Sequence, residues 1–183
     1  MLRIIRATDF AEGRWKNGMG ISWDIASDPP GAGADHFGWR FAIARIDADV
    51  PFSAYPEVDR LFTLIDGNGL ALDVDGQGLI DVNRRHIPHG FPGDAPTSCR
   101  LKDGPCRALN LFLARRGWSA TVEIISGTGR IAHDGPVLLF ALDGSVHVGG
   151  DRLEQGDAAI ARGEVRLDAG ACRLYAARLT EEN

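Results

Sequence analysis

An internal repeat is the feature of this chain that most restricts its fold. The stretch Leu61–Arg115 is followed by a shorter stretch of the same character, Leu138–Leu179. The first opens with "LFTLIDGNGLAL" and the second with "LLFALDGSVHV", so that Asp66 of the first copy aligns with Asp143 of the second. Two related units in one small chain predict a duplicated β-barrel or β-sandwich.

The two copies also end alike. The segment "DGPCRALNLFLAR" begins at Asp103, and its counterpart "DAGACRLYAARL" begins at Asp168. The stretch from Asp143 to Asp168 is shorter than the stretch from Asp66 to Asp103 by about 12 residues, as expected where a surface loop has been lost. A barrel with an open mouth is a natural place to hold a small ligand.

Glycine and proline, at 23 and 9 residues, divide the sequence into short apolar segments. Asp-Gly pairs favour tight turns between strands. They occur at Asp66, Asp75, Asp103, Asp134 and Asp143. No long stretch shows the 3.6-residue period of an amphipathic helix. We therefore expect an all-β fold of two β-barrel or jelly-roll units packed together, with few short helices.

The joint between the two units is expected in the segment Ser126–Asp134, "SGTGRIAHD". This segment is too short for a flexible linker, so we expect the units to pack against each other as a single compact structural unit. In this interpretation residues 1–130 form the N-terminal strands and the first barrel. Residues 131–183 form the second, shorter unit.

Composition excludes several classes of partner. The net charge of −5 argues against nucleic acid, because phosphate binding needs a basic surface. No run approaches the roughly 20 apolar residues that span a membrane, and the N-terminus lacks the pattern of a secretory signal. Cys99, Cys106 and Cys172 are an odd set without metal-type spacing. We therefore expect a cytoplasmic protein with reduced thiols, no nucleic-acid partner and no membrane association.

Three polar side chains interrupt apolar strand patterns. In "WRFAIARI", Arg40 shares a face with Ala42 and Ala44, whose small side chains leave space that a guanidinium can enter. The alternative is a solvated arginine on an edge strand. Arg60 begins the next apolar strand, either as one half of a rim ion pair or as a ligand clamp. Asn110 lies within "RALNLFLAR", where a buried amide must bond either a neighbouring loop or a ligand.

The metal and catalytic motifs of small β-barrels are missing from the sequence. His86 and His89 have a proline between them and no glutamate soon after, and His133 and His147 lack acidic neighbours in a ligand pattern. Ser53 has no evident base to activate it as a nucleophile. We therefore expect no bound metal, no cofactor and no catalytic residue.

Several segments of the chain resemble the motifs of the HutD/Ves family of small bacterial bicupins, and they occur in the same order as in that family. They are "WKNGMGIS" from Trp15, "WRFAIA" from Trp39, "VPFSAYPEVDR" from Val50, "FPGD" from Phe91 and "DGPCRALN" from Asp103. The resemblance is specific from about Leu2 to Ala132 and looser through the second unit. It implies that the two expected β units are cupin barrels, so that the fold is a bicupin.

The chain departs from the family pattern at three positions. Met19, Ala42 and Ala108 stand where the family has a glycine, a serine and an aspartate. Each change makes the expected pocket smaller or less polar. Such changes suit a divergent member of the family with a different ligand.

The resemblance implies a regulatory protein that restrains histidine catabolism by binding an intermediate of that pathway, such as urocanate or a formylated glutamate. The implied ligand site lies in the first barrel and contains Trp15, Asn17, Arg40, Ser53, Arg60, Phe91 and Asn110. In this interpretation Arg40 and Arg60 hold the carboxylate of a small anionic metabolite. Asn17 and Asn110 orient the ligand, and Trp15 covers its apolar part.

Two other functions stay open at this point. One is a metal-free cupin enzyme, such as an isomerase or a lyase, that uses an acid or a base in the pocket. The other is a structural module with a vestigial pocket, which the three departures favour. The sequence also leaves open whether the protein forms a homodimer.

Overall fold

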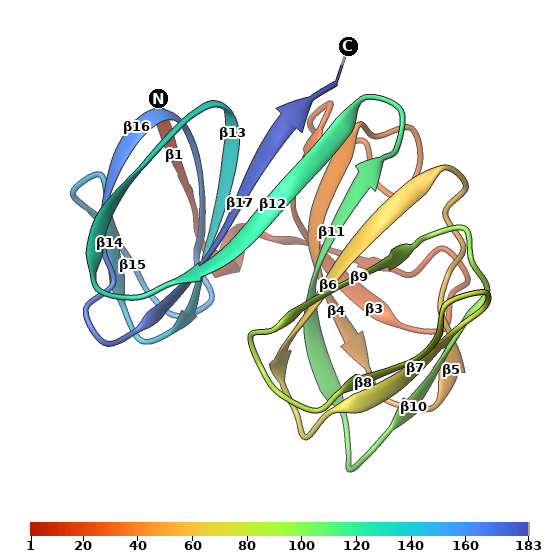
Figure 1. Cartoon of the computed structure of the whole chain (residues 1–183). Helices are drawn as coiled ribbons and strands as arrows, with labels where there is room; N and C mark the ends of the chain where they lie inside the picture. Colours follow the sequence, from red (N-terminus) through yellow and green to blue (C-terminus); the bar gives the residue numbers. More distant parts are fainter. Residues whose placement is uncertain (183) are drawn as a thin grey trace. The chain divides into compact units, whose positions relative to one another are not determined.

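The computed structural model describes residues 1–182 of the 183-residue chain, and the regular secondary structure of these residues is almost entirely β-strand (Figure 1). The only helix within this part of the chain is a single 3-10 turn, η1 (Ala7–Asp9). The all-β prediction is therefore confirmed. No helix among these residues is long and apolar enough to cross a membrane.

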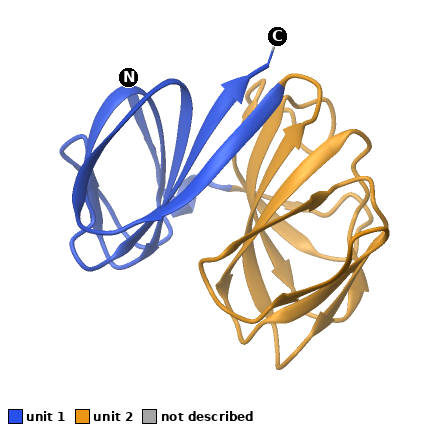
Figure 2. Ribbon diagram, in the orientation of Figure 1, with its two compact units in different colours: residues 1–10, 118–183 blue, residues 11–117 orange. Residues whose placement is uncertain are grey.

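The chain divides into two compact units (Figure 2). Unit 1 contains Met1–Phe10 and the chain from Trp118 onward, and unit 2 contains Ala11–Gly117. The boundary thus lies near residue 117 and not at the expected residue 130. The first ten residues, which we expected in the first barrel, belong to the unit that is built from the second half of the chain.

Unit 2 consists of a six-stranded and a four-stranded antiparallel sheet. The six-stranded sheet has the order β2 (Ala11–Arg14), β3 (Ile21–Asp28), β4 (Trp39–Ile46), β11 (Cys106–Ala114), β6 (Val58–Asp66) and β9 (Pro88–Pro92). The four-stranded sheet has the order β5 (Val50–Pro51), β10 (Thr97–Leu101), β7 (Leu70–Val74) and β8 (Gly78–Val82). Both sheets contribute to one apolar core, so the unit is a jelly-roll sandwich, not a barrel closed by hydrogen bonds.

Side-chain alternation explains the inner face of unit 2. On β6, Phe62 and Leu64 are fully buried and pack in the same core cluster as Leu70 and Leu72 of β7. Arg60 lies two residues before Phe62 and therefore projects from the same face. On the inner face of β6, the apolar side chains are therefore preceded by a positively charged one.

Unit 1 is one continuous antiparallel sheet. Its order is β12 (Trp118–Ile125), β17 (Arg173–Glu181), β13 (Thr128–Asp143), β16 (Ala158–Asp168), β14 (Val146–Val148) and β15 (Asp151–Leu153). The N-terminal strand β1 (Leu2–Ile5) also pairs with β16. These ladders of β1 with β16 and of β12 with β17 place both segments in unit 1, which accounts for the shifted boundary.

A buried carboxylate holds the N-terminal segment in unit 1. Asp157 accepts hydrogen bonds from the Arg6 guanidinium at 2.7 Å and from the backbone N–H of Ala7 at 2.9 Å. It also accepts the backbone N–H of Glu154 at 3.0 Å. A carboxylate with this many partners stays buried and charged, so the segment after β1 is fixed beside β16.

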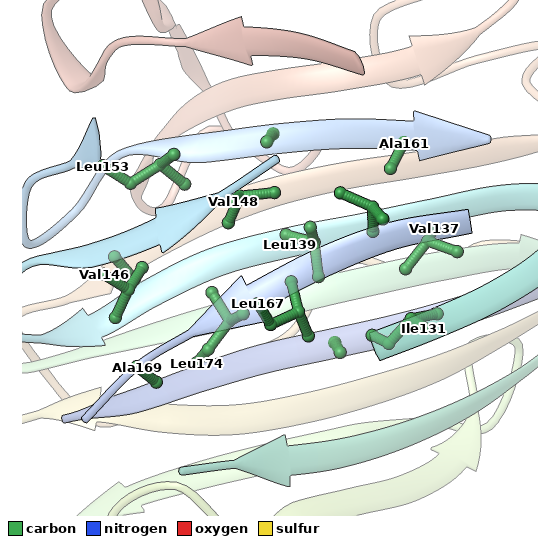
Figure 3. Close-up of a cluster of buried hydrophobic side chains, with 14 residues drawn as sticks. Ile131, Val137, Leu139, Val146, Val148, Leu153, Ala161, Leu167, Ala169 and Leu174 are labelled. Carbon is green, nitrogen blue, oxygen red and sulfur yellow. The ribbon is translucent and has the colours of Figure 1, made fainter. Parts of the chain in front are cut away.

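The core of unit 1 is aliphatic throughout (Figure 3). Val137 and Leu139 of β13 are fully buried there with Leu174 and Ala176 of β17. Ile131, from the first half of β13, joins the same cluster. Both halves of this long strand therefore contribute to one core.

Strand pairing confirms the internal repeat. In unit 2, β6 pairs with β9 and β11, and β7 pairs with β8 and β10. In unit 1, β13 pairs with β16 and β17, and β14 pairs with β15 and β16. The single strand β16 therefore takes the place of both β9 and β10, which explains why the second copy is shorter.

The registers also identify equivalent positions in the two units. Phe62 lies opposite Asn110, and Leu139 lies opposite Ala176, so Asn110 and Ala176 are equivalent positions of the final strands. The sequence alignment of Asp103 with Asp168 differs from this register by one residue. The turn before the final strand is one residue longer in unit 1 than in unit 2. By the same registers, Val137 in unit 1 corresponds to Arg60 in unit 2.

Candidate functional site

A small cavity lies in unit 2, against the inner face of the six-stranded sheet. Its polar lining consists of Ser22, Arg40, Ser53, Tyr55, Arg60 and Asn110. Its apolar lining includes Trp15, Phe52, Phe112 and Ala42. The free space is about 30 Å³, which is room for about two water molecules.

Arg60 is a buried cation in the lining of this cavity. Only 6% of the residue is exposed, and its guanidinium lies between the rings of Phe52, Phe91 and Phe112, at 5.0, 5.0 and 4.8 Å from their centroids. Its one strong hydrogen bond goes from Nη2 to Asn110 Oδ1 at 2.7 Å. Three aromatic faces and a neutral amide stabilise the charge without neutralising it.

Arg60 has no counter-ion within the described part of the chain. None of the ion pairs among residues 1–182 involves Arg60, and its buried Nε has no hydrogen-bond partner there. Burial is the largest cause that lowers the pKa of the guanidinium to about 10, and the nearby charge of Arg40 lowers it as well. At neutral pH the group is therefore still charged, buried and electrostatically unsatisfied.

Arg40 occupies the neighbouring wall in a different electrostatic state. Its Nε donates to Asp24 Oδ1 at 2.8 Å, and its Nη2 lies 2.5 Å from the same oxygen. Its remaining hydrogen bonds reach Tyr55 and Ser22, both at 3.4 Å. Asp24 thus neutralises Arg40, so that the net positive charge of the cavity resides on Arg60.

The hydroxyl groups of the cavity are used as acceptors by the protein. Ser53 Oγ accepts the backbone N–H of Asn17 at 3.1 Å, and Tyr55 and Ser22 accept from Arg40. Each hydroxyl keeps its own O–H available as a donor. The cavity therefore presents donors, and no carboxylate, imidazole or thiol is among its lining residues.

The turn between β2 and β3 forms one wall of the cavity. The Trp15 indole Nε1 donates to the backbone carbonyl of Ile21 at 3.0 Å, and its ring meets Phe52 edge-on at 5.5 Å between centroids. A Cβ on Gly20 would lie only 2.4 Å from this ring, so only glycine allows the turn to fold back on the indole. Trp15 is thereby held in place without a ligand.

Five of the seven residues expected at the site line the cavity together: Trp15, Arg40, Ser53, Arg60 and Asn110. Asn17 lies outside it, where its Nδ2 donates to the backbone carbonyl of Pro51 at 2.9 Å and ties the turn to β5. Phe91 contacts the Arg60 guanidinium but is not part of the lining. The expected role of Asn17 in orienting a ligand therefore has no direct contact to support it.

Sequence reasoning did not single out Tyr55, Asp24 or Phe112 as site residues. Phe112 stands two residues after Asn110 on β11, so the alternation of side chains could have found it. Tyr55 lies in the loop after β5, where no such alternation applies. Asp24 gives no such signal, because it reaches Arg40 through the pairing of β3 with β4, which includes a register shift after Asp24.

The three departures from the family pattern lie in different surroundings. Ala42 lines the cavity and lies opposite Asn110 in the sheet. Ala108 is fully buried in the apolar core of unit 2. Met19 is 51% exposed and is not part of the lining. Only Ala42 therefore changes the surface that a ligand would meet.

The histidines do not form a cluster with acidic residues or cysteines. Among residues 1–182 no three His, Cys, Asp or Glu side chains come close enough to hold a metal ion. His86 lies in the turn before β9, and His89 lies on β9 opposite Phe62. The expectation of a metal-free site stays a prediction.

A family model, two curated relatives and one solved structure all relate the chain to the same family. The model of the HutD family matches residues 7–176. An uncharacterised 21.2 kDa protein from the hutC 3' region of Pseudomonas putida is 36% identical over 151 residues, which cover 80% of this chain and 77% of that protein. Protein Ves of Cronobacter sakazakii is 30% identical, with 72% and 71% covered. The solved structure of HutD from Pseudomonas fluorescens SBW25 is 31% identical, has a TM-score of 0.88 and is matched over all of both chains.

Proposed function

The chain belongs to the HutD family, and from this premise we propose that it binds the carboxylate of a small metabolite in unit 2, without catalysis, as a sensor in histidine catabolism. Arg60 is the anchor of the ligand. Arg40, Ser53, Tyr55 and Asn110 surround the carboxylate, and Trp15 covers one side of the site.

One observation carries the proposal, and it is the unpaired charge of Arg60. A buried ion without a counter-ion lowers the stability of the fold by several kcal/mol. An anion in the cavity supplies the missing charge and accepts hydrogen bonds from the guanidinium in a bidentate geometry. The hydroxyl donors around it favour an anionic group over a cation or an apolar group.

The size of the cavity limits what enters it. About 30 Å³ accommodates a carboxylate group but not a whole molecule of urocanate or formylglutamate. In our proposal the carboxylate replaces water at Arg60, and the remainder of the ligand lies outside the cavity. Urocanate-like and formylglutamate-like acids, both carboxylates of histidine breakdown, fit this arrangement.

The regulatory part of the proposal draws on the names of relatives. A relative from Pseudomonas putida is named for its position 3' of hutC, and the structural relative from Pseudomonas fluorescens is a HutD protein. We propose that ligand occupancy reports the concentration of a pathway intermediate in the cytoplasm. The three free cysteines suit a reducing compartment.

The two alternative functions have weaker support. A metal-free isomerase or lyase needs a general acid or base at the substrate. The lining contains no carboxylate, imidazole or thiol, and its one phenol, Tyr55, accepts a hydrogen bond from Arg40. If the pocket had no function, an apolar residue at position 60 would make the fold more stable than Arg60 does. Unit 1 has such a residue, Val137, at the corresponding position. Retention of a buried arginine therefore favours binding.

A thermal-shift screen tests the proposal. Urocanate, formylglutamate, formiminoglutamate, glutamate and simple dicarboxylic acids are compared with their uncharged amides. At 100 times its dissociation constant, a true ligand stabilises the fold by roughly 2.7 kcal/mol. The proposal fails if no carboxylate raises the melting temperature more than its amide does.

A further inference from the structure

A carboxylic acid larger than formate needs an opening in the wall of the Arg60 cavity. The free space of about 30 Å³ accommodates the carboxylate group alone, so the remainder of a larger acid has to pass through the wall. The lining residues come from three parts of unit 2: the strands of the six-stranded sheet, the loop after β5, and the turn between β2 and β3. These three parts differ in how firmly the fold holds them.

The sheet is the part of the wall that cannot open. Arg40, Asn110 and Arg60 lie on β4, β11 and β6, and each of these strands pairs with a neighbour on both sides. All three residues are buried. A shift of any one strand would break ladder hydrogen bonds on two sides, so the ligand does not enter through the sheet.

The loop after β5 is also firmly held. The backbone N–H of Phe52 donates to the carbonyl of Thr97 at 2.8 Å, and the backbone N–H of Tyr55 donates to the carbonyl of Gly93 at 2.8 Å. Phe52, Ser53 and Tyr55 are each at most 9% exposed. Opening at this loop would break backbone hydrogen bonds and bring two buried aromatic rings into water.

The turn Trp15–Gly20 is the most weakly held part of the wall. Every residue from Lys16 to Met19 is exposed, and the turn follows β2, which is the edge strand of its sheet. Its own hydrogen bonds are internal: the Trp15 N–H donates to the Gly20 carbonyl at 2.9 Å, and the Gly18 N–H donates to the Trp15 carbonyl at 2.8 Å. The turn can therefore move as one body without losing them.

Asn17 supplies the hydrogen bonds that fasten this turn to the loop after β5. Its backbone N–H donates to Ser53 Oγ at 3.1 Å, and its side-chain Nδ2 donates to the Pro51 carbonyl at 2.9 Å. The ion pair of Lys16 with Asp35 joins two exposed side chains, and such pairs contribute little. Asn17 therefore decides how readily the turn separates from the loop.

We propose that Asn17 sets the size selectivity of the site, because its two hydrogen bonds hold the Trp15–Gly20 turn closed over the cavity. The inference rests on the proposed function, since it concerns access to the Arg60 site. An acid as small as formate fits behind the closed turn. A longer acid displaces the turn, and the bonds of Asn17 are lost when it binds.

Ser53 couples the turn to the ligand. Its Oγ accepts the N–H of Asn17 and also lines the cavity, where its O–H is available to a carboxylate. A hydroxyl that donates to an anion becomes a stronger acceptor, so formate in the cavity strengthens the bond between Ser53 and Asn17. Small and large acids therefore have opposite effects on the closed turn.

Calorimetric titration of the full chain with formate and with butyrate tests the inference. Asn17→Ala removes the bond to Pro51 and the acceptor of the Met19 N–H. The variant should bind butyrate at least about threefold more tightly than the wild type, because less has to be broken when the turn opens. Its affinity for formate should stay within about twofold of the wild type.

Asn68→Ala is the matched control. Asn68 is an exposed asparagine of unit 2 whose Nδ2 bonds Asp103 outside the cavity, so this variant should match the wild type for both acids. Weaker binding of butyrate by Asn17→Ala would show that Asn17 contacts the ligand directly and would overturn the inference. An unchanged affinity for butyrate, or equal gains for butyrate and formate, would overturn it as well.

Hydrogen exchange at the backbone amide of Asn17 gives a second readout in the wild-type protein. Saturating formate should slow this exchange relative to the unliganded protein, and saturating butyrate should accelerate it. Equal protection by both acids would show that the turn stays closed over the longer acid, and the inference would be wrong.

The outcomes separate this inference from the proposed function. If formate binds but Asn17→Ala fails to favour butyrate, the role of Asn17 is refuted and the Arg60 site stands. If neither acid binds to any of the three proteins, both are refuted.

Discussion

The two units share one pattern of strand pairing but differ in what that pattern encloses. At equivalent inward positions, unit 2 has Arg60 and Asn110, whereas unit 1 has Val137 and Ala176. The unit 1 pair is fully buried in a continuous aliphatic core (Figure 3). The unit 2 pair is hydrogen-bonded at a cavity. The fold therefore sets where a site can form, and a few inward side chains decide whether that place becomes a site or a core.

A second difference lies in the chain that precedes the equivalent strands. In unit 2 the short strand β5 ends at Pro51, and a loop follows that brings Ser53 and Tyr55 to the cavity. In unit 1 the strand β13 continues through this region, with only a register shift between His133 and Val137. Unit 1 thus lacks both the cation and the loop that would surround a ligand.

The largest expected effect comes from placing the unit 2 residue in unit 1. Val137→Arg should lower the free energy of unfolding by at least about 4 kcal/mol, because the aliphatic core offers no aromatic cage, amide or cavity to the cation. Urea denaturation measures the change. Val137→Leu, an apolar control, should cost about 1–3 kcal/mol through overpacking. A Val137→Arg protein as stable as the Val137→Leu protein would show that the two interiors are not as different as described.

A smaller effect is expected at the neutralised arginine. Arg40→Ala should weaken carboxylate binding about tenfold, because it removes a charge-assisted donor from the wall and leaves Asp24 as an unpaired anion near the ligand. Fluorescence or calorimetric titration measures the affinity. Arg152→Ala, which alters an exposed ion pair with Glu154 in unit 1, is the control and should leave binding unchanged. Equal binding by both variants would remove Arg40 from the site.

The pH dependence gives a further, milder test. Burial lowers the pKa of Arg60 to about 10, and the anion needs the charged form. Affinity should therefore be constant from neutral pH to about pH 9 and fall by roughly fourfold at about pH 10.5. The sign for stability is opposite: the unfolded chain holds this proton more tightly, so the unliganded fold gains stability from this group as the pH rises above about 10. Affinity that is unchanged at about pH 10.5 would show that the pKa of Arg60 is not lowered to this range, and the Arg60 variant described below then tests its role as the anchor.

Much of the fold could be predicted from the sequence because it depends on local signals. Asp-Gly turns and the repeated strand patterns of Leu61–Arg115 and Leu138–Leu179 predict an all-β duplicated fold, and the strand registers confirm it. The unit boundary lies near residue 117 because β12 pairs with β17, and the first ten residues join unit 1 because β1 pairs with β16. Both partners lie far along the chain, and no local pattern reports them.

The site was predictable only in part. Arg40, Arg60 and Asn110 were visible as polar residues within apolar strands, and they do converge. Their unequal roles were not visible, because Asp24 reaches Arg40 through the pairing of two strands, while Arg60 hydrogen-bonds the neutral amide of Asn110. Sequence patterns show which face a side chain occupies, but not which charge lies beside it.

The central claim is that Arg60 is an anion anchor and that the core of unit 1 has no equivalent site. We would titrate formate, the carboxylate best matched to a cavity of about 30 Å³, into the wild-type protein and the Arg60→Met variant, and follow backbone amide chemical shifts by NMR. The account predicts saturable shifts in the wild type that are confined to unit 2. It predicts at least about a hundredfold weaker binding in Arg60→Met, which should be at least as stable as the wild type toward urea. Undiminished binding by Arg60→Met, or a second saturable site in unit 1, would contradict it.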